Sequence, residues 1–269
     1  MHRRELRDGL AVVPVPSPTL PPATHTNAWL LGRSRLFVVD PAGVKAEDQQ
    51  LLADAIKNDT VAGIFLTHHH KDHIGGTLDL QQRTGAPILC SQETAERVPF
   101  EVQDILADGD TLEADGEPWH VLHTPGHATG HLCLHSELTG DMVAGDMVAG
   151  VGTILLAPPE GVLKSYIESL ERLIERNPLR LLPAHGPEIV PAVSYLKEYI
   201  DHRKMRSRQI LFQLAEGPRT LLELAAAIYQ ELPREFHPLA AVQIRCHLLD
   251  LVDKGEAYQR GDVYGATEM

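Results

Sequence analysis

The stretch Thr-His-His-His-Lys-Asp-His-Ile-Gly-Gly at residues 67–76 is the most informative part of this chain. It contains the spacing His68-x-His70-x-Asp72-His73, with three imidazoles and a carboxylate close together. Imidazole nitrogen and carboxylate oxygen together suit zinc, iron or manganese in a site that keeps room for water. The alternative is a His-rich tract without function, but this run is internal and followed by Gly-Gly. The stretch therefore predicts a metal site.

The apolar run Val61–Leu66 directly precedes this cluster and predicts a buried strand. The cluster then lies in the loop at the C-terminal end of a strand, where open α/β sheets place their chemistry. Three further predicted strands end in residues of metal-ligand type: His127 after Thr-Pro-Gly, Asp146 in Ala-Gly-Asp, and His185 in Pro-Ala-His-Gly. One histidine at a strand end is commonly a core or surface residue. Four such strand ends predict that the side chains converge on metal.

Short strand-like and helix-like segments fill the first two thirds of the chain. The expected strands are Leu10–Val15, Asn27–Leu31, Leu36–Val39, Val61–Leu66, Pro87–Cys90, Trp119–His123, Leu132–His135, Met142–Asp146 and Leu179–Leu182, and the expected helices are Ala46–Asn58, Thr77–Thr84 and Gly161–Arg176. Leu132–His135 and Met142–Asp146 are expected to form a hairpin. Two sets of strands, each closed by helices, fit an α/β fold in which two sheets pack together with helices outside. This is a four-layer αββα sandwich.

The character of the sequence changes near residue 191, which we take as the boundary between domains 1–190 and 191–269. A long helix is expected over Ala192–Glu216, followed by helices over Thr220–Gln230 and Pro238–Lys254 and a hairpin between Ala257 and Gly265. Helix, helix and hairpin in this order are typical of a small, mainly α winged-helix domain.

Composition limits the classes of function. With 269 residues, 43% of them hydrophobic, the chain can form one large domain and a small one. Its 24 Lys and Arg against 37 Asp and Glu give a net charge of −13, which disfavours non-specific nucleic-acid binding. Three scattered cysteines imply no disulfide framework and favour the cytoplasm. No secretory signal or membrane span is expected, so no membrane partner is predicted.

Taken together, the histidine cluster, His127, Asp146 and His185 resemble the metallo-β-lactamase superfamily over residues 10–190. Asp40, in Phe-Val-Val-Asp-Pro-Ala-Gly, resembles the aspartate of that family's first motif. The chain is also similar to the β-lactamase-like endoribonuclease and glyoxalase-II-like subgroup with a C-terminal winged-helix-like domain. This further similarity lies in Thr-Pro-Gly-His-x-x-x-His at 124–131, the Gly-rich stretch after residue 146, Ile-Asp-His-Arg-Lys at 200–204 and the tail.

The resemblance implies a site for two divalent metal ions, with zinc expected and iron or manganese as alternatives. It assigns His68, His70 and His127 to one ion, Asp72, His73 and His185 to the other, and Asp146 to both. Asp141 competes for the bridging role because Asp-Met-Val-Ala-Gly occurs twice in tandem, at 141–145 and 146–150. We favour Asp146, which ends the inner strand, whereas Asp141 lies in a turn.

Two such ions, about 3.5–4 Å apart, would lower the pKa of a bridging water and stabilise charge in the transition state. The catalytic residues are then predicted to be Asp72 and Asp146. Asp40 and Thr67 are expected to hold ligand imidazoles or the metal loop. The residues predicted to contact substrate are Asn27, His131, Arg203 and Arg206.

The substrate is less well indicated than the reaction class. The favoured prediction is a hydroxide-dependent hydrolase of phosphodiesters that cleaves single-stranded RNA, because the basic run at 203–208 and the winged-helix-like tail follow the metal domain. The alternative is a thioester hydrolase acting on a small molecule or an acyl carrier, with a β-lactamase side activity. Less favoured are a mononuclear iron sulfur dioxygenase and a regulator without catalysis. The tail is expected to pack over the site or to mediate self-association into a homo-oligomer.

Overall fold

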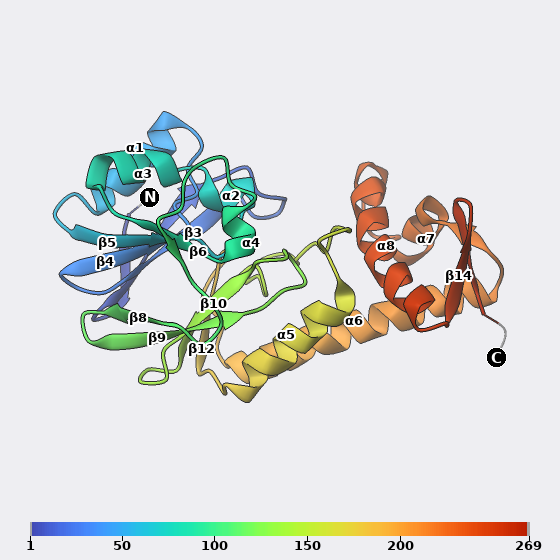
Figure 1. The fold of residues 1–269 in the computed structure, drawn as a ribbon. Coiled ribbons are helices and arrows are strands. Elements are labelled where there is room, and N and C mark those ends of the chain that lie inside the picture. The colour runs from blue at the N-terminus through green and yellow to red at the C-terminus, as the bar shows by residue number, and fades with distance from the viewer. Residues whose placement is uncertain (1, 268–269) are drawn as a thin grey trace.

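Two β-sheets that pack face to face, with helices on both outer faces, form the larger domain (Figure 1). This computed structural model describes residues 2–267. The first sheet contains, in spatial order, β1 (Arg4–Arg7), β2 (Leu10–Pro16), β3 (His25–Leu31), β4 (Arg35–Val39), β5 (Thr60–Phe65), β6 (Ile88–Cys90) and β7 (Asp104–Ile105). The second contains β12 (Arg180–Pro183), β11 (Asp141–Gly145), β10 (Leu132–His135), β9 (Glu117–His123) and β8 (Thr111–Ala114). The predicted four-layer sandwich is confirmed.

Alternation of side chains along the strands produces these layers. Leu10 and Val12 of β2 belong to the core between the sheets, whereas Ala11 and Val13 belong to the core under the outer helices. Successive residues of a strand face opposite sides, so one strand supplies both cores. The outer helices are α1 (Ala46–Ala55) and α3 (Thr77–Thr84) on the first sheet, and α5 (Leu163–Glu175) and α6 (Ala192–Ala215) on the second.

The C-terminal domain has the predicted order of helix, helix and hairpin. It contains β13 (Arg219–Thr220), α7 (Leu221–Ile228), a 3₁₀ turn (Arg234–Phe236), α8 (His237–Asp253), β14 (Ala257–Arg260) and β15 (Val263–Ala266). Helix α6 connects the domains (Figure 1). Leu196 and Ile200 pack in the core beneath the second sheet, while Ile210 and Leu214 pack in the core of the small domain. One continuous helix therefore belongs to both domains.

The structure contains several short strands and helices that the sequence did not predict. The edge strands β1 and β7, and the short helices α2 (Lys71–Ile74) and α4 (Gln92–Ala95), have no hydrophobic periodicity of their own. Strand β1 is largely polar and exposed because it pairs with only one neighbour.

Within the described residues, no helix is long and apolar enough to cross a membrane.

Asp141, the competing candidate for the bridging ligand, lies at the opposite end of β11 from Asp146. Its buried carboxylate accepts hydrogen bonds from Nε of Arg7 and Nε of Arg180, both at 2.7 Å. It therefore joins the N-terminal strand to the second sheet, and its role is structural. Burial raises the pKa of Asp141, but Arg180 and Arg7 more than offset this and hold it below its ordinary value.

We expect Asp141→Asn to lower the free energy of unfolding by about 1–3 kcal/mol. The change removes the charge that pairs with Arg7 and Arg180, and because both arginines are only partly exposed, water replaces these ion pairs incompletely. A carboxyl group with a lowered pKa stabilises the fold above its unfolded pKa of about 3.9, and this contribution is lost as pH falls through the folded pKa. Urea unfolding at several pH values should therefore show the difference at neutral pH and its loss in acid. A constant difference down to pH 2 would contradict this account.

Candidate metal centre

The predicted ligands come together at one end of the two sheets. His68 and His70 follow β5, His127 follows β9, Asp146 follows β11 and His185 follows β12. Strands β4, β5 and β6 are parallel, as are β11 and β12, so their carboxyl ends meet at the same edge. Donor atoms within 4.8 Å of one another define four groups among the described residues. Three of them contain the predicted ligands, namely His68–His70–His127, His68–His73–Asp146 and Asp72–His73–His185, and the fourth is His69–His70–Glu160.

The first cluster consists of the ring nitrogens of three histidines. Nδ1 of His70 lies 2.9 Å from Nε2 of His68 and 3.0 Å from Nε2 of His127, and the latter two atoms are 3.3 Å apart. Ligands on a tetrahedral zinc ion with bonds of about 2.0–2.1 Å are spaced by about 3.3 Å. Burial, and then His127, lower the pKa of His70 to about 3, so its ring is neutral and offers a lone pair.

The second cluster consists of Asp72, His73 and His185. Nε2 of His185 lies 3.5 Å from Oδ2 of Asp72. Burial opposes ionisation of Asp72, yet His73 and His185 lower its pKa to about 2. Burial likewise opposes protonation of His185, but Asp146 and then Asp72 raise its pKa to about 10. A cation bound here would displace a proton from His185 and replace it as the partner of the carboxylates.

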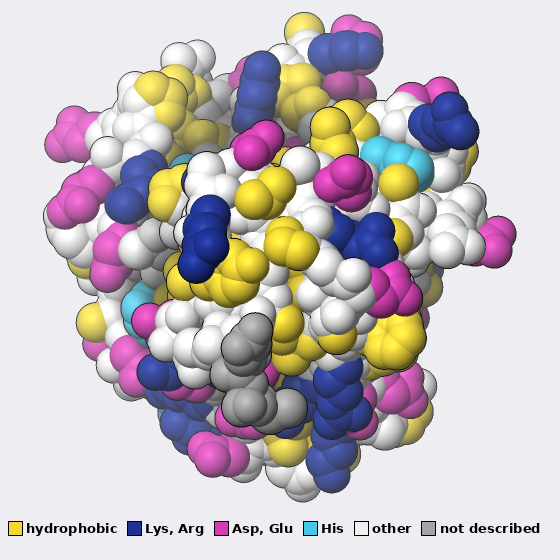
Figure 2. Space-filling view, turned by 90° about the vertical axis from the view of Figure 1, so that its right-hand side faces the viewer, with side chains coloured by type: hydrophobic (Ala, Val, Ile, Leu, Met, Phe, Trp, Pro, Cys, Tyr) yellow, Lys and Arg dark blue, Asp and Glu magenta, His cyan; other side chains and the backbone are white. Residues whose placement is uncertain are grey.

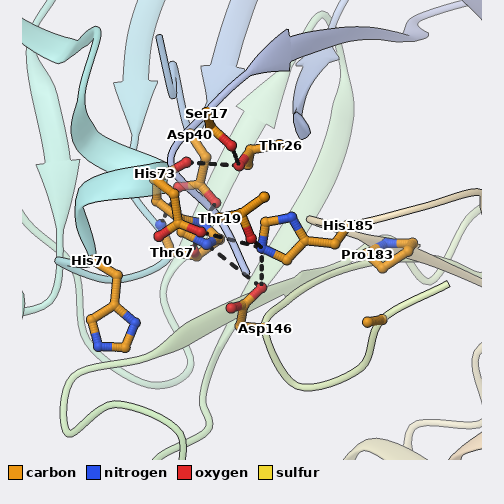
Figure 3. Close-up of polar contacts among 12 residues, drawn as sticks. Ser17, Thr19, Thr26, Asp40, Thr67, His70, His73, Asp146, Pro183 and His185 are labelled. Atoms are coloured by element: carbon orange, nitrogen blue, oxygen red, sulfur yellow. Dashed lines mark hydrogen bonds and ion pairs between the residues drawn. The ribbon is translucent and has the colours of Figure 1, made fainter. Parts of the chain in front are cut away.

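Asp146 lies between the two clusters, and its contacts toward His73 and His185 are drawn in Figure 3. Its Oδ2 is 3.4 Å from Nε2 of His127, while its Oδ1 is 3.3 Å from Nε2 of His185 and 3.5 Å from Nε2 of His73. Oδ1 of Asp146 and Nε2 of His73 are buried and make only these ion-pair contacts of 3.3–3.5 Å, without a hydrogen bond of good geometry among the described residues. Such atoms are costly unless something binds them. The donor set therefore fits divalent cations, and Asp146 offers one carboxylate oxygen to each cluster.

A hydrogen-bond network anchored on Asp40 orients two of the imidazoles. Oδ2 of Asp40 accepts from Nδ1 of His73 at 2.8 Å and from the hydroxyl of Thr67 at 2.7 Å. The backbone N–H of Thr67 donates to Oδ1 of Asp40 at 2.8 Å. Because the single hydroxyl hydrogen of Thr67 goes to Asp40, Oγ1 accepts from Nδ1 of His68 at 2.9 Å. Nε2 of both histidines is thereby free to bind metal.

Backbone carbonyls orient two further ligands, His127 and His185, in the same way. Nδ1 of His127 donates to the carbonyl of Leu155 at 3.0 Å, and Nδ1 of His185 donates to the carbonyl of His25 at 3.0 Å. Each bond places the remaining nitrogen, Nε2, toward the clusters. Four of the five ligand histidines are thus held by a defined partner outside the metal site.

The backbone around Asp40 is shaped to bring its carboxylate under the metal loop. Asp40 has a φ of 52°, in the left-handed region that non-glycine residues rarely occupy. Gly76 packs against the next residue of that segment, since a Cβ there would lie 2.4 Å from the carbonyl oxygen of Pro41. A glycine is therefore required at position 76 because the metal loop and the segment after Asp40 approach too closely for a side chain.

Two of the residues predicted to contact substrate instead support the site. His131 is fully buried; its Nε2 accepts from the backbone N–H of Asp146 at 3.1 Å and its Nδ1 donates to Oγ1 of Thr124 at 2.8 Å. Asn27 is also buried, and its amide donates to the carbonyls of Pro183 and Gly186 beside His185. Both ring nitrogens of His131 and the amide nitrogen of Asn27 are thus bonded to neighbouring protein groups, so these buried side chains support the site and do not line the cavity, contrary to the prediction.

Arg203 and Arg206 of α6, also predicted to contact substrate, are placed away from the cavity, while Lys204 and Arg208 of the same basic run are exposed. Arg203 is only 3% exposed, and its Nη2 donates to the carbonyl of Ile154 at 2.6 Å. The guanidinium of Arg206 lies 4.1 Å from the ring centroid of Tyr229 inside the small domain. Neither side chain lines the cavity at the metal centre. The sequence places four basic residues close together, but the helix turns Arg203 inward and stacks Arg206 on a tyrosine.

A cavity of about 180 Å³ opens directly onto the ligands. Its apolar wall comes from two loops, residues 18–23 and 149–157. The second loop follows Asp146, where the sequence already indicated an influence on the pocket, whereas the first loop was not expected at the site. Thr19 of the first loop brings Oγ1 to 3.3 Å from Nε2 of His185 (Figure 3). Glu160 lies at the cavity and is paired with Arg97 at 2.8 Å and with His69 at 3.1 Å. The dense prolines of the first loop were the available signal, because they predict an ordered, extended segment.

Comparison with known proteins agrees with this geometry. Residues 21–185 match the metallo-beta-lactamase superfamily, and residues 220–266 match the beta-lactamase associated winged helix domain. The chain is 29% identical to the Beta-lactamase-like protein 2 homolog of Drosophila melanogaster, over 86% of this chain and 83% of that protein. It is 31% identical to an atrochrysone carboxyl ACP thioesterase of Passalora fulva, over 76% of this chain and 63% of that protein.

A solved structure shares both domains. The metallo-beta-lactamase family protein from Thermus thermophilus is 25% identical and superposes with a TM-score of 0.82, covering 98% of this chain and 100% of that one. Together with the ligand geometry and the match to residues 21–185, this identifies the chain as a member of the metallo-beta-lactamase superfamily that carries a C-terminal beta-lactamase-associated winged-helix domain.

Proposed function

We propose that this member of a hydrolase superfamily hydrolyses thioesters. The observation that carries the proposal is the cavity wall. Ten of its lining side chains are apolar, namely Pro18, Leu20, Pro21, Pro22, Ala23, Ala149, Val151, Ile154, Leu155 and Ala157. None of the described lining residues is a lysine or an arginine. Such a wall suits a neutral chain beside the scissile bond, as in an acyl thioester.

The roles of the protein groups follow from their positions. Two divalent ions, proposed to be zinc, would supply Lewis acidity to activate water and polarise the carbonyl oxygen. Asp72 and Asp146 place ionised carboxylates beside the cavity, where they can orient a water molecule. The apolar wall holds the acyl or thiol arm and excludes bulk solvent. Exclusion of water strengthens the electrostatic interactions made by the ligand residues that line the same cavity. Thr19 adds a hydroxyl to the cavity lining beside His185.

The similarity to an acyl-carrier-protein thioesterase supports this choice. The substrate is then a thioester of a small thiol or of an acyl carrier. Cleavage of single-stranded RNA, the prediction favoured from the sequence, stays a prediction. A polyanion needs cationic side chains along its path, and aromatic faces commonly stack its bases. On the face seen in Figure 2, Lys and Arg lie in small groups among acidic and hydrophobic side chains.

A substrate panel tests the proposal. Purified protein, loaded separately with zinc, iron or manganese, is incubated with acyl thioesters of glutathione and pantetheine, with single-stranded RNA and with a β-lactam. We expect thioester turnover that is lost on chelation and restored by metal. The Asp146→Asn protein, prepared in parallel, controls for contaminating hydrolases. RNA cleavage without thioester turnover would overturn the proposal, and oxygen consumption with an iron-loaded protein would support the dioxygenase alternative instead.

A further inference from the structure

The loop Met147–Gly161, between β11 and α5, both walls the cavity and holds a metal ligand. Residues 149 and 151–155 of this loop line the cavity. The carbonyl of Leu155 accepts the hydrogen bond from Nδ1 of His127. Whatever fixes the position of Leu155 therefore also fixes the tautomer and orientation of that ligand.

Side chains on one face of α6 hold this loop from behind. The hydroxyl of Tyr195 donates to the carbonyl of Ala149 at 2.8 Å, and the hydroxyl of Tyr199 accepts from the N–H of Ala149 at 3.0 Å. Nη2 of Arg203 donates to the carbonyl of Ile154. These three residues are spaced by four, so they lie along one stripe of the helix.

The winged-helix domain makes the next contact along the same loop. Oε1 of Gln243, on α8, accepts from the N–H of Leu156 at 2.9 Å. Consecutive residues of the loop are thus held by α6 at Ile154, by the metal ligand at Leu155 and by α8 at Leu156. Gln243 is only 7% exposed, and its contact is with the metal domain, although it belongs to the small one.

The burial of Arg203 indicates that its position serves more than packing. No carboxylate pairs with it among the described residues; its partners are the carbonyl of Ile154 and the ring of Tyr166, whose centroid is 5.2 Å away. A buried charge without a counter-ion costs free energy that an apolar side chain would avoid. Its guanidinium is instead placed to hold one side of the segment that carries the acceptor for His127.

We propose that Arg203 and Gln243 are positioning residues for the metal ligand His127, and that the winged-helix domain is therefore a structural part of the metal centre. The second cluster provides an internal comparison. His73 is held by Asp40 after β4, and His185 is held by the carbonyl of His25 in β3. Neither anchor comes from the loop, so disturbing Arg203 or Gln243 should weaken the first cluster selectively.

The test measures metal affinity, which does not depend on knowing the substrate. Full-length Arg203→Met and Gln243→Met are titrated with zinc against a chromophoric chelator in two backgrounds. The His185→Ala background leaves the cluster of His68, His70 and His127, and the His70→Ala background leaves the other. We expect affinity to fall about 10-fold in the first background and to change little in the second. Removing a ligand's direct outer partner costs about 10- to 100-fold, and these variants loosen that partner, the carbonyl of Leu155, without removing it.

Matched variants separate positioning from general damage. Lys204→Met on α6 and Arg245→Met on α8 remove exposed cations from the same helices and should leave both affinities unchanged. Gln243→Glu keeps an acceptor oxygen and should bind metal more tightly than Gln243→Met. If Arg203→Met does not fold, as judged by circular dichroism, the metal affinities of Gln243→Met and Gln243→Glu in the two backgrounds test the proposal. Wild-type affinity in both backgrounds, or an equal loss in both, would overturn the proposal.

Discussion

Asp146→Asn is expected to abolish the proposed hydrolysis, with a loss on the order of 10³-fold or more in kcat/KM, because in the proposed mechanism activation of water would need both cations. Its two oxygens face different clusters, at 3.4 Å from His127 and 3.3 Å from His185. An amide keeps one oxygen but replaces the other with a donor, which cannot bind a cation. Metal analysis by mass spectrometry should show fewer than two ions per chain, and the thioester assay should show the loss of rate.

Asp141→Asn is the matched control, because it makes the same change at the other end of the same strand. Its carboxylate pairs with Arg7 and Arg180 and is remote from the clusters. We expect this variant to be less stable but to retain two ions and near wild-type turnover at a temperature where it is folded. If Asp146→Asn retained both ions and full activity, the assignment of Asp146 as the bridging ligand would be wrong.

Asp40→Asn is expected to weaken metal binding by about 10- to 100-fold and to lower the free energy of unfolding by about 2–4 kcal/mol. Its carboxylate accepts from three donors, the N–H and hydroxyl of Thr67 and Nδ1 of His73. Asparagine tolerates the left-handed backbone at this position, so the effect reports the lost acceptor and not strain. Chelator competition and thermal unfolding of the metal-free protein measure the two effects separately.

Asp48→Asn provides the comparison for Asp40. This aspartate is also buried, but it lies in the first turn of α1 and contacts no ligand. It should lower stability without changing metal affinity. Unchanged metal affinity in Asp40→Asn would mean that the hydrogen bonds to Thr67 and His73 do not orient the site.

The sequence was most informative where a local pattern carries the structure. Alternating apolar residues determine which face of each strand is buried, and this is a property of neighbouring residues alone. A loop that follows a buried strand must emerge at its carboxyl end, so His68, His127, Asp146 and His185 could be assigned to one edge before the structure was known. The choice of Asp146 over Asp141 rested on the prediction that Asp146 ends a strand and Asp141 lies in a turn. The structure instead places Asp141 at the first residue of β11, at the opposite end from Asp146.

Long-range packing decided what the sequence could not. Arg203 belongs to a basic run, yet it is buried because α6 continues from the metal domain into the small one and turns this side chain toward residue 154. His131 and Asn27 are buried polar residues near the site. Nε2 of His131 accepts from the backbone of Asp146, and the amide of Asn27 donates to the distant backbone of Pro183. Nothing in local composition distinguishes such a residue from one that binds substrate.

The sequence alone therefore predicted the sandwich fold and the candidate ligands, since strand periodicity and residue type can be recognised from neighbouring residues. Only the tertiary structure showed the shape and character of the cavity, because its walls come from loops 18–23 and 149–157, which meet through contacts of long sequence separation. It also showed that Gln243 of the C-terminal domain reaches the loop that holds His127. Hydrogen bonds between elements so far apart depend on how the domains pack, which no local pattern specifies.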